Sequence, residues 1–285
     1  QRQMCIRDRF FVVLVKDVIA HKNELDKSKM GFNVIVSMVA NFFDTLGIGS
    51  YAIATSAWKF NKSIKDDLIP GTLNVAFGIP ICVEATITMT RIEMDSLTLV
   101  LMIAAAIVGS ILGAKIISRM DIMKIRVIMG VALILVAIIT LCKINGVGPF
   151  GILGTARGLT GGLLVAGVVA NFILGILMTA GIGLYAPCMA VVLLLGMSAD
   201  VAFPVMMGSC AYLMAFGNGP KFIAQGRYDM VACWTQAIFG AIGVYCAYAF
   251  VSSLPLETLT KVIAVIVYIT AFLYLHDAIK KGSAA

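Results

Sequence analysis

The chain has 285 residues, of which 60% are hydrophobic and only 13% are charged, and its mean hydropathy is +0.99. A soluble protein carries roughly 25% charged residues, so this composition excludes a soluble fold and predicts a polytopic helical membrane protein. The net charge of +7 does not indicate nucleic-acid binding, because the bases lie in short segments between apolar runs. The seven cysteines form no CxxC pair and there are only two histidines, so we expect no metal centre and no cofactor.

The N-terminal segment, 1–29, is treated separately from the membrane region. Residues 1–9 (QRQMCIRDR) are polar and do not resemble a signal peptide, so we interpret them as a cloning or gene-assembly remnant. Residues 10–20 are mostly apolar but shorter than the roughly 20 residues that a membrane span requires. They predict either an interfacial helix or a truncated first span.

The rest of the chain divides into two similar halves, 30–145 and 146–285. The first apolar run, 30–58, is interrupted at Gly47–Ser50, and a second, glycine-rich run, 158–196, is interrupted at Gly181–Gly183. We interpret each run as a helical hairpin with a broken helix. Three spans are expected to follow each hairpin, near 68–90, 97–117 and 122–141 in the first half and near 201–215, 230–251 and 260–276 in the second.

A repeated pattern indicates that the two halves arose by duplication. The motif GIG-x-YA occurs at 47–52 and again at 181–186, an offset of 181 − 47 = 134 residues. The same offset relates Asp66 to Asp200, Pro70 to Pro204, Asp95 to Asp229, Gly109 to Gly243 and Ser118 to Ser252. The motif VANF, at 39–42 and 169–172, has an offset of 130, so the second copy carries four additional residues before its break.

Each half contains an odd number of net membrane crossings, which predicts that the halves are inverted relative to each other. In this topology all lysines and arginines beyond position 20 lie on one side, except Arg91, Lys143, Arg157 and Lys261. The positive-inside rule then places the C-terminus in the cytoplasm of a multi-pass inner-membrane protein. The predicted fold is therefore all-α, with two inverted repeats that each comprise a broken-helix hairpin and three transmembrane helices. A parallel duplication is the alternative.

The two glycine breaks are the candidate binding site. At such a break backbone groups lose their helical partners, and the N-terminus of the following half-helix can bind an anion. Polar side chains near the breaks and on the following spans supply hydroxyl and amide donors without a fixed buried cation. The candidate substrate-binding residues are Asn41, Gly47, Gly49, Ser50, Tyr51, Asn74, Asn171, Gly181, Gly183, Tyr185 and Ser209.

Two acidic residues in apolar runs are candidates for ion coupling, because such residues are costly in a membrane and usually functional. Asp44 precedes the first break and either couples transport to protons or caps a half-helix. Glu84 lies in the middle of a span and either senses protons or extends to the membrane interface. Lys59 follows the first hairpin and is interpreted as an ordinary flanking charge.

Four segments of the chain resemble the TauE/SafE sulfite-exporter family, also called the TSUP permeases. They are NFFDTLGIGSY (41–51), DLIPGTLN (67–74), NFILGILMTAGIGLYAP (171–187) and GPKFIAQGRY (219–228). The resemblance implies outward transport of sulfur-containing anions such as sulfite, sulfonates, sulfoacetate or thiosulfate. Some members carry a longer glycine run with a downstream proline at the first break. Here Ser50 follows Gly49, and a proline, Pro187, occurs only in the second copy.

We therefore expect a secondary transporter that exports a small sulfur-containing anion by alternating access at a midplane site, and we do not expect an enzyme. No GxxxxGKS/T loop for ATP is present in the sequence. The expected partners are the small anion and the lipid bilayer. An anion channel and a permease for a different small anion are the alternatives.

Overall fold

The computed structural model of the chain describes residues 29–47, 49–65, 68–117, 154–178, 183–251 and Val265. Within these residues the regular secondary structure is helical, and one isolated β-bridge joins Ala156 to Met197. The helices are α2 (Met30–Thr45), α3 (Ser50–Asn61), α4 (Ile69–Ala76), α5 (Gly78–Arg91), α6 (Ser96–Ile117), α8 (Gly161–Met178), α9 (Tyr185–Leu194), α10 (Ala202–Leu213), α11 (Gly219–Ala224), α12 (Met230–Thr235) and α13 (Ala241–Val251), with the 3₁₀ segment η4 (Ala199–Val201) and the π-helical segments η5 (Met214–Asn218) and η6 (Gln236–Gly240). The all-α prediction is confirmed for the described residues.

Four helical stretches in the described part of the chain are long and apolar enough to cross a membrane. They are Ser96–Gly113, Gly161–Met178, Ala199–Ala224 and Met230–Phe250. Their length and composition are compatible with a multi-pass membrane protein. The spans expected near 122–141 and 260–276, and the segment 10–20, lie outside the described residues.

Both predicted interruptions of the hairpin runs coincide with helix ends. Helix α2 ends at Thr45 and α3 begins at Ser50, while α8 ends at Met178 and α9 begins at Tyr185. Gly47 (φ 91°) and Gly49 (φ 88°) adopt backbone angles that L-residues with a side chain rarely adopt. Glycine therefore permits the first break to turn within four residues.

The span expected near 68–90 is two helices rather than one. Helix α4 ends at Ala76 and α5 begins at Gly78. Pro80 has no backbone N–H, so it cannot donate the helical hydrogen bond to the carbonyl of Ala76. This loss weakens the helix at Phe77 and separates α4 from α5.

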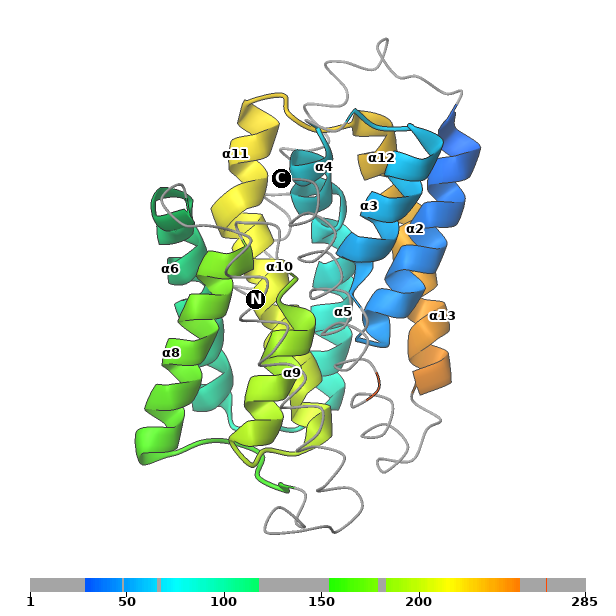
Figure 1. Cartoon of the computed structure of the whole chain (residues 1–285). Coiled ribbons are helices and arrows are strands. Elements are labelled where there is room, and N and C mark those ends of the chain that lie inside the picture. Colours follow the sequence, from blue (N-terminus) through cyan, green and yellow to red (C-terminus); the bar gives the residue numbers. More distant parts are fainter. Residues whose placement is uncertain are drawn as a thin grey trace, which may run out of the picture. The chain divides into compact units, whose positions relative to one another are not determined.

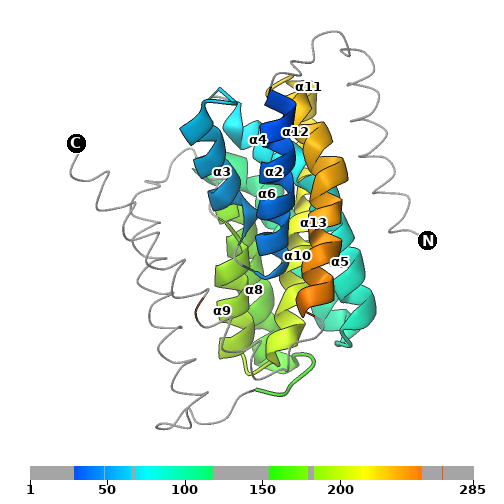
Figure 2. The same ribbon diagram turned by 90° about the vertical axis from the view of Figure 1, so that its right-hand side faces the viewer.

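By their internal contacts, the described residues form two compact units: those within 1–87 and 210–252, and those within 88–209 together with Val265. In the first unit α2 packs along α12, η6 and α13, and α3 packs against α2. Figures 1 and 2 both show α2 (blue) beside α13 (orange). In the second unit α6 packs along α8, and α9 also contacts α8. Each unit thus combines helices from both halves of the sequence.

Close packing at glycine occurs in the same way in both units. In the second unit a Cβ on Gly109 would lie 2.1 Å from the carbonyl oxygen of Phe172. In the first unit a Cβ on Gly243 would lie 2.5 Å from the carbonyl oxygen of Met38. Gly109 and Gly243 are related by the offset of 134, whereas the VANF offset of 130 pairs Phe172 with Phe42, about one helical turn beyond Met38. Helix α6 therefore contacts α8 through the same glycine position by which α13 contacts α2, with a shift of one turn along the partner helix.

A second pair of glycine contacts lies about one turn along the same helices. A Cβ on Gly175 would lie 2.2 Å from the carbonyl oxygen of Ala106, and one on Gly240 would lie 2.6 Å from Nδ2 of Asn41. Here 106 + 134 = 240, and the VANF offset of 130 pairs Asn41 with Asn171, one helical turn before Gly175. Small residues allow helices in a membrane to approach closely, so these glycines define the helix pairing inside each unit.

Equivalent aspartates cap the helices that follow them. Asp95 accepts a hydrogen bond from the backbone N–H of Thr98 at 2.7 Å, at the start of α6. Asp229 accepts one from the backbone N–H of Ala232 at 2.8 Å, at the start of α12. The offset relates the two aspartates, since 95 + 134 = 229, and it also relates the two residues that donate to them, since 98 + 134 = 232. Aspartate is among the preferred residues at this position because its carboxylate satisfies an otherwise unpaired helix N–H.

Candidate functional site

A row of buried polar side chains runs along one side of α2 in the first unit. Asn33, Ser37, Asn41 and Thr45 are four residues apart and therefore lie on the same helix face. Ser37 Oγ donates to the carbonyl oxygen of Asn33 at 2.6 Å, and Asn41 Nδ2 donates to that of Ser37 at 2.7 Å. Thr45 Oγ1 lies 2.9 Å from the carbonyl oxygen of Asn41. We call these four residues the polar stripe.

Three other elements of the first unit contribute a polar side chain to the polar stripe. From α3, Trp58 Nε1 donates to Oδ1 of Asn33 at 3.1 Å. From α5, Glu84 Oε1 lies 2.8 Å from Oγ1 of Thr45. From η6, Gln236 Oε1 accepts a hydrogen bond from Nδ2 of Asn41. The stripe is therefore a cluster to which four elements contribute, inside otherwise apolar helices.

The pair Asn41–Gln236 has hydrogen-bonding capacity that the protein does not use. Asn41 Oδ1 and Gln236 Nε2 are buried and have no hydrogen-bond partner in the structure. Gln236 begins a π-helical turn, and such turns occur often at functional sites. Gly240, in the same turn, provides the space that the amide of Asn41 occupies. The pair can thus offer one acceptor and one donor to a small polar ligand.

At the first break, Asp44 caps the half-helix α3. Its Oδ1 accepts a hydrogen bond of 2.6 Å from the backbone N–H of Ser50, and the Asp44 side chain is buried, with 1% of its surface exposed. The Asp44 carbonyl also accepts from the N–H of Gly47 at 2.8 Å. Of the two roles considered for Asp44, capping is thus observed. While this hydrogen bond is present, the Ser50 amide is not available to an anion.

The aromatic residue after the break packs against the residue that joins α4 to α5. Tyr51 is half-buried, its ring centroid lies 5.9 Å from that of Phe77, and its hydroxyl is buried without a hydrogen-bond partner. Asn74, on α4, is also buried. Thr72, one turn before the end of α4, accepts a hydrogen bond from the backbone N–H of Asp229 at 2.9 Å. Thr72 therefore connects α4 to the start of α12.

The second unit contains a separate polar cluster around Asn171. Asn171 is fully buried on α8, and its Nδ2 donates to the carbonyl oxygen of Met102 at 2.7 Å and to Ser209 Oγ at 2.8 Å. Cys188 Sγ lies 3.7 Å from Oδ1 of the same side chain. Tyr185 is buried as the first residue of α9. Four helices, α6, α8, α9 and α10, thus contribute to this cluster.

The clusters in the two units correspond by sequence. Asn41 and Asn171 are the asparagines of the two VANF motifs, and they bond to Gln236 and Met102 respectively. These partners are related by the repeat, since 102 + 134 = 236. The asparagine before each break therefore contacts the equivalent position of a helix from the other half of the chain.

The predicted site residues are thus distributed between the two units, each of which is described by itself. The first unit contains Asn41, Asp44, Gly47, Gly49, Ser50, Tyr51, Asn74 and Glu84, and the second contains Asn171, Gly183, Tyr185 and Ser209, while Gly181 lies outside the described residues. The four-residue spacing of polar residues in an apolar run could have identified Asn33, Ser37 and Thr45. Gln236 carried no signal beyond being a lone amide in a span.

Two other charged residues have clear structural positions. Glu84 is buried, with 1% of its surface exposed, so the alternative that it extends into solvent at a membrane interface is wrong. Lys59 is exposed in the last turn of α3, where a cation interacts favourably with the helix dipole.

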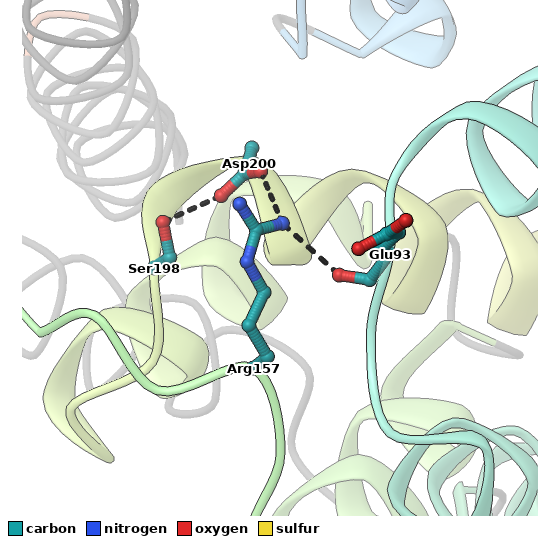
Figure 3. A network of polar contacts seen from close by, with 4 residues as sticks. All are labelled: Glu93, Arg157, Ser198 and Asp200. Atoms are coloured by element: carbon teal, nitrogen blue, oxygen red, sulfur yellow. Dashed lines mark hydrogen bonds and ion pairs between the residues drawn. The ribbon is translucent and has the colours of Figure 1, made fainter.

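An ion-paired arginine joins three loop segments of the second unit (Figure 3). Arg157 Nη1 lies 2.7 Å from Oδ2 of Asp200 and donates to the carbonyl oxygen of Glu93 at 3.0 Å. Ser198 Oγ donates to the other carboxylate oxygen of Asp200. The guanidinium is half exposed and already paired, so we interpret it as a loop contact of modest energy rather than an anion site.

No protein-family model, curated protein or solved structure matches the chain.

Proposed function

We propose that the protein is a multi-pass membrane transporter that exports a small sulfur-containing anion, of the sulfite, sulfonate, sulfoacetate or thiosulfate class. One observation carries the proposal: each of two glycine-associated helix breaks follows a fully buried asparagine, Asn41 or Asn171, that bonds to polar atoms of neighbouring helices. Polar groups in membrane helices are costly and usually mark the path of a substrate. The resemblance of these segments to sulfite exporters supports the choice of cargo.

The repeated contacts support alternating access. The close-packed glycines Gly109 and Gly243 are related by the sequence offset, as are the caps Asp95 and Asp229. We propose that the halves are inverted repeats, in which the first helix of each hairpin packs against the second of the three spans of the other half. Rocking of such repeats about a midplane site exposes the site to each side in turn. The C-terminus lies in the cytoplasm in this proposal.

Uncharged hydrogen-bond donors can bind an anion that the protein must afterwards release. The polar groups gathered at Asn41 and at Asn171 are amides, hydroxyls, an indole, a thiol and the carboxyl group of Glu84, and no lysine or arginine side chain is buried among the described residues. Amide and hydroxyl donors bind an oxyanion without trapping it beside a fixed charge. The Asp44 carboxylate opposes an anion at the first break. We therefore propose that an anion binds more strongly to the amides at the start of α9 than to those at the first break.

A thermal-shift screen of the purified protein tests the proposal. A ligand that binds the folded state raises its apparent stability, so we expect a higher melting temperature with one or more of sulfite, thiosulfate, taurine and sulfoacetate. Sulfate and simple carboxylates serve as controls for ionic strength. Asn171→Ala should abolish the increase in melting temperature, because it removes the amide that donates hydrogen bonds to both α6 and α10. A shift that is equal for every anion, or absent for every sulfur anion, counts against the proposed cargo.

Counterflow separates a transporter from a channel. Proteoliposomes loaded with unlabelled anion are diluted into a trace of the same anion with a radioactive label. An alternating-access protein accumulates label transiently above equilibrium, whereas a pore only equilibrates it. Export itself is favoured by about 2.3 kcal/mol per negative charge at 100 mV, negative inside, so no ATP is required.

A further inference from the structure

We propose that the Asn41–Gln236 pair selects singly charged sulfur anions that also carry a hydrogen-bond donor, such as hydrogen sulfite or a hydroxysulfonate, over anions that carry only acceptors. This inference rests on the proposed function, because it specifies which form of the cargo the first unit accepts. Its evidence is the arrangement of donors and acceptors around two buried amide side chains. Both lie in the first unit, Asn41 on α2 and Gln236 at the start of η6.

The orientation of both amides follows from one backbone carbonyl. The carbonyl oxygen of Ser37 can only accept, so the Asn41 side-chain atom that lies 2.7 Å from it must be the amide nitrogen, Nδ2. The same nitrogen contacts the Gln236 side chain, so the atom that it contacts there must be the oxygen, Oε1. Both protons of the Asn41 amide are then used. Asn41 Oδ1 remains as an acceptor, and Gln236 Nε2 remains as a donor.

The remaining acceptor and donor are buried, unpaired and close together. Asn41 has none of its surface exposed and Gln236 has 1%, and neither Asn41 Oδ1 nor Gln236 Nε2 has a hydrogen-bond partner. Because a hydrogen bond joins the two amides, these atoms lie within about 7 Å of each other, the combined length of that bond and of the two amide groups. A single small molecule can therefore contact both atoms. Leaving buried polar atoms unpaired is costly, so a ligand that pairs them is stabilised.

The second unit provides an internal comparison. Asn171, the equivalent asparagine, donates from Nδ2 to the carbonyl oxygen of Met102 and to Ser209 Oγ, and Cys188 Sγ lies 3.7 Å from its Oδ1. Both polar atoms of Asn171 therefore have a contact. Met102 occupies the position equivalent to Gln236, so the second half has no side-chain amide there. The unused acceptor and donor are thus not a general property of the asparagine before a break.

A ligand that pairs both atoms must donate one hydrogen bond and accept another. Gln236 Nε2 can donate to a sulfite or sulfonate oxygen, but Asn41 Oδ1 repels any ligand oxygen that has no proton to share. Thiosulfate and sulfate present only acceptors near neutral pH, so they leave Asn41 Oδ1 unpaired. Hydrogen sulfite and hydroxysulfonates carry an O–H group in addition to their acceptor oxygens.

The surroundings of the pair also favour a single negative charge. No lysine or arginine side chain is buried among the described residues, and the buried carboxyl group of Glu84 contacts Thr45, one helical turn from Asn41. The cost of moving an ion into an apolar region rises steeply with its charge, so a dianion is disfavoured. Because both amides are buried, the anion reaches them only when the surrounding helices move, as alternating access requires.

A matched pair of sulfonates tests the inference at constant pH. Isethionate and propane-1-sulfonate have the same charge and chain length, but isethionate ends in a hydroxyl group and propane-1-sulfonate ends in a methyl group. We expect the purified wild-type protein to bind isethionate roughly ten- to a hundredfold more tightly, as measured by titration of the thermal shift, because propane-1-sulfonate leaves Asn41 Oδ1 unpaired. Equal affinities, or no binding of isethionate while another sulfur anion binds, overturn the inference and leave the proposed function standing. If no sulfur anion binds, both fail.

Substitutions then assign the selectivity to the pair. Asn41→Leu removes the acceptor and should make the two sulfonates bind equally. Gln236→Met removes the donor and should weaken the binding of isethionate about tenfold. Thr235→Val is the matched control, because the Thr235 hydroxyl is buried next to Gln236 but donates only to backbone carbonyls, so the preference for isethionate should persist. A full preference for isethionate in Asn41→Leu overturns the inference, and if this variant does not fold, unchanged isethionate binding by Gln236→Met does so.

Discussion

At the scale of single residues, the first break depends on backbone angles that only glycine adopts easily. Gly49 has φ 88°, and a Cβ at this position would meet no atom within 4 Å. Gly49→Ala therefore changes backbone strain without creating a clash, and we expect a loss of about 1–3 kcal/mol in the free energy of unfolding. Gly31→Ala is the matched control, since its Cβ also meets open space and alanine favours a helix. Unfolding in mixed micelles measures both, and equal effects would contradict the strain.

The charge of Asp44 and its capping role can be separated by substitution. Asp44→Asn keeps an oxygen that accepts from the Ser50 N–H but removes the negative charge beside the break. We expect the stability to change little and the affinity for thiosulfate to increase, as measured by titration of the thermal shift. Asp44→Ala removes the cap as well and should cost about 1 kcal/mol of stability. Weaker thiosulfate binding by Asp44→Asn would show that the charge does not oppose the anion.

At the scale of helices, the contact between α2 and η6 depends on the absence of a side chain at Gly240. A Cβ there would lie 2.6 Å from Asn41 Nδ2 and 2.7 Å from Cγ of Pro80. We expect Gly240→Ala to lower the free energy of unfolding by about 1–3 kcal/mol and to weaken anion binding, since Asn41 must move. Gly162→Ala, on α8 with open space around it, is the control. If Gly240→Ala is as stable as the wild type, α2 and η6 can move apart at little cost in free energy.

The cap of α6 makes a contribution to stability that depends on pH. The hydroxyl and backbone N–H of Thr98 donate to Asp95 and lower the pKa of its carboxyl in the folded protein. A lowered pKa means that the folded state stabilises the ionised form. This contribution is complete above the unfolded pKa, near pH ~4, and is lost as the pH falls through the folded value. In Asp95→Asn the melting temperature should therefore depend less on pH below about pH 4 than it does in the wild type. Near neutral pH this dependence should be the same in both proteins. The same fall of melting temperature with decreasing pH in both proteins would contradict this role of Asp95.

At the scale of the whole molecule, the positions of the helices were more predictable than their partners. The breaks at Gly47–Ser50 and Gly181–Gly183 were predictable because glycine and the duplicated motif both mark them. The pairing of α2 with α12, η6 and α13 was not, because nearly all faces of these helices are apolar and the close contacts depend on individual glycines such as Gly240 and Gly243. For the same reason the sequence indicated Asn41 and Glu84 but not the Gln236 and Thr45 side chains that contact them.

The proposed inverted orientation of the two halves makes a prediction about which side of the membrane each hairpin faces. Phe60 is 93% exposed near the end of α3, and its equivalent at 60 + 134 = 194, Leu194, is 49% exposed at the end of α9. We introduce Phe60→Cys and Leu194→Cys separately into a background without native cysteines, which also serves as the unlabelled control. A membrane-impermeant maleimide should label Phe60→Cys only in inside-out vesicles, because the lysines that follow α3 are expected in the cytoplasm. It should label Leu194→Cys only in intact spheroplasts. Labelling of both cysteines from the same side would indicate a parallel duplication, and alternating access between inverted repeats would then be untenable.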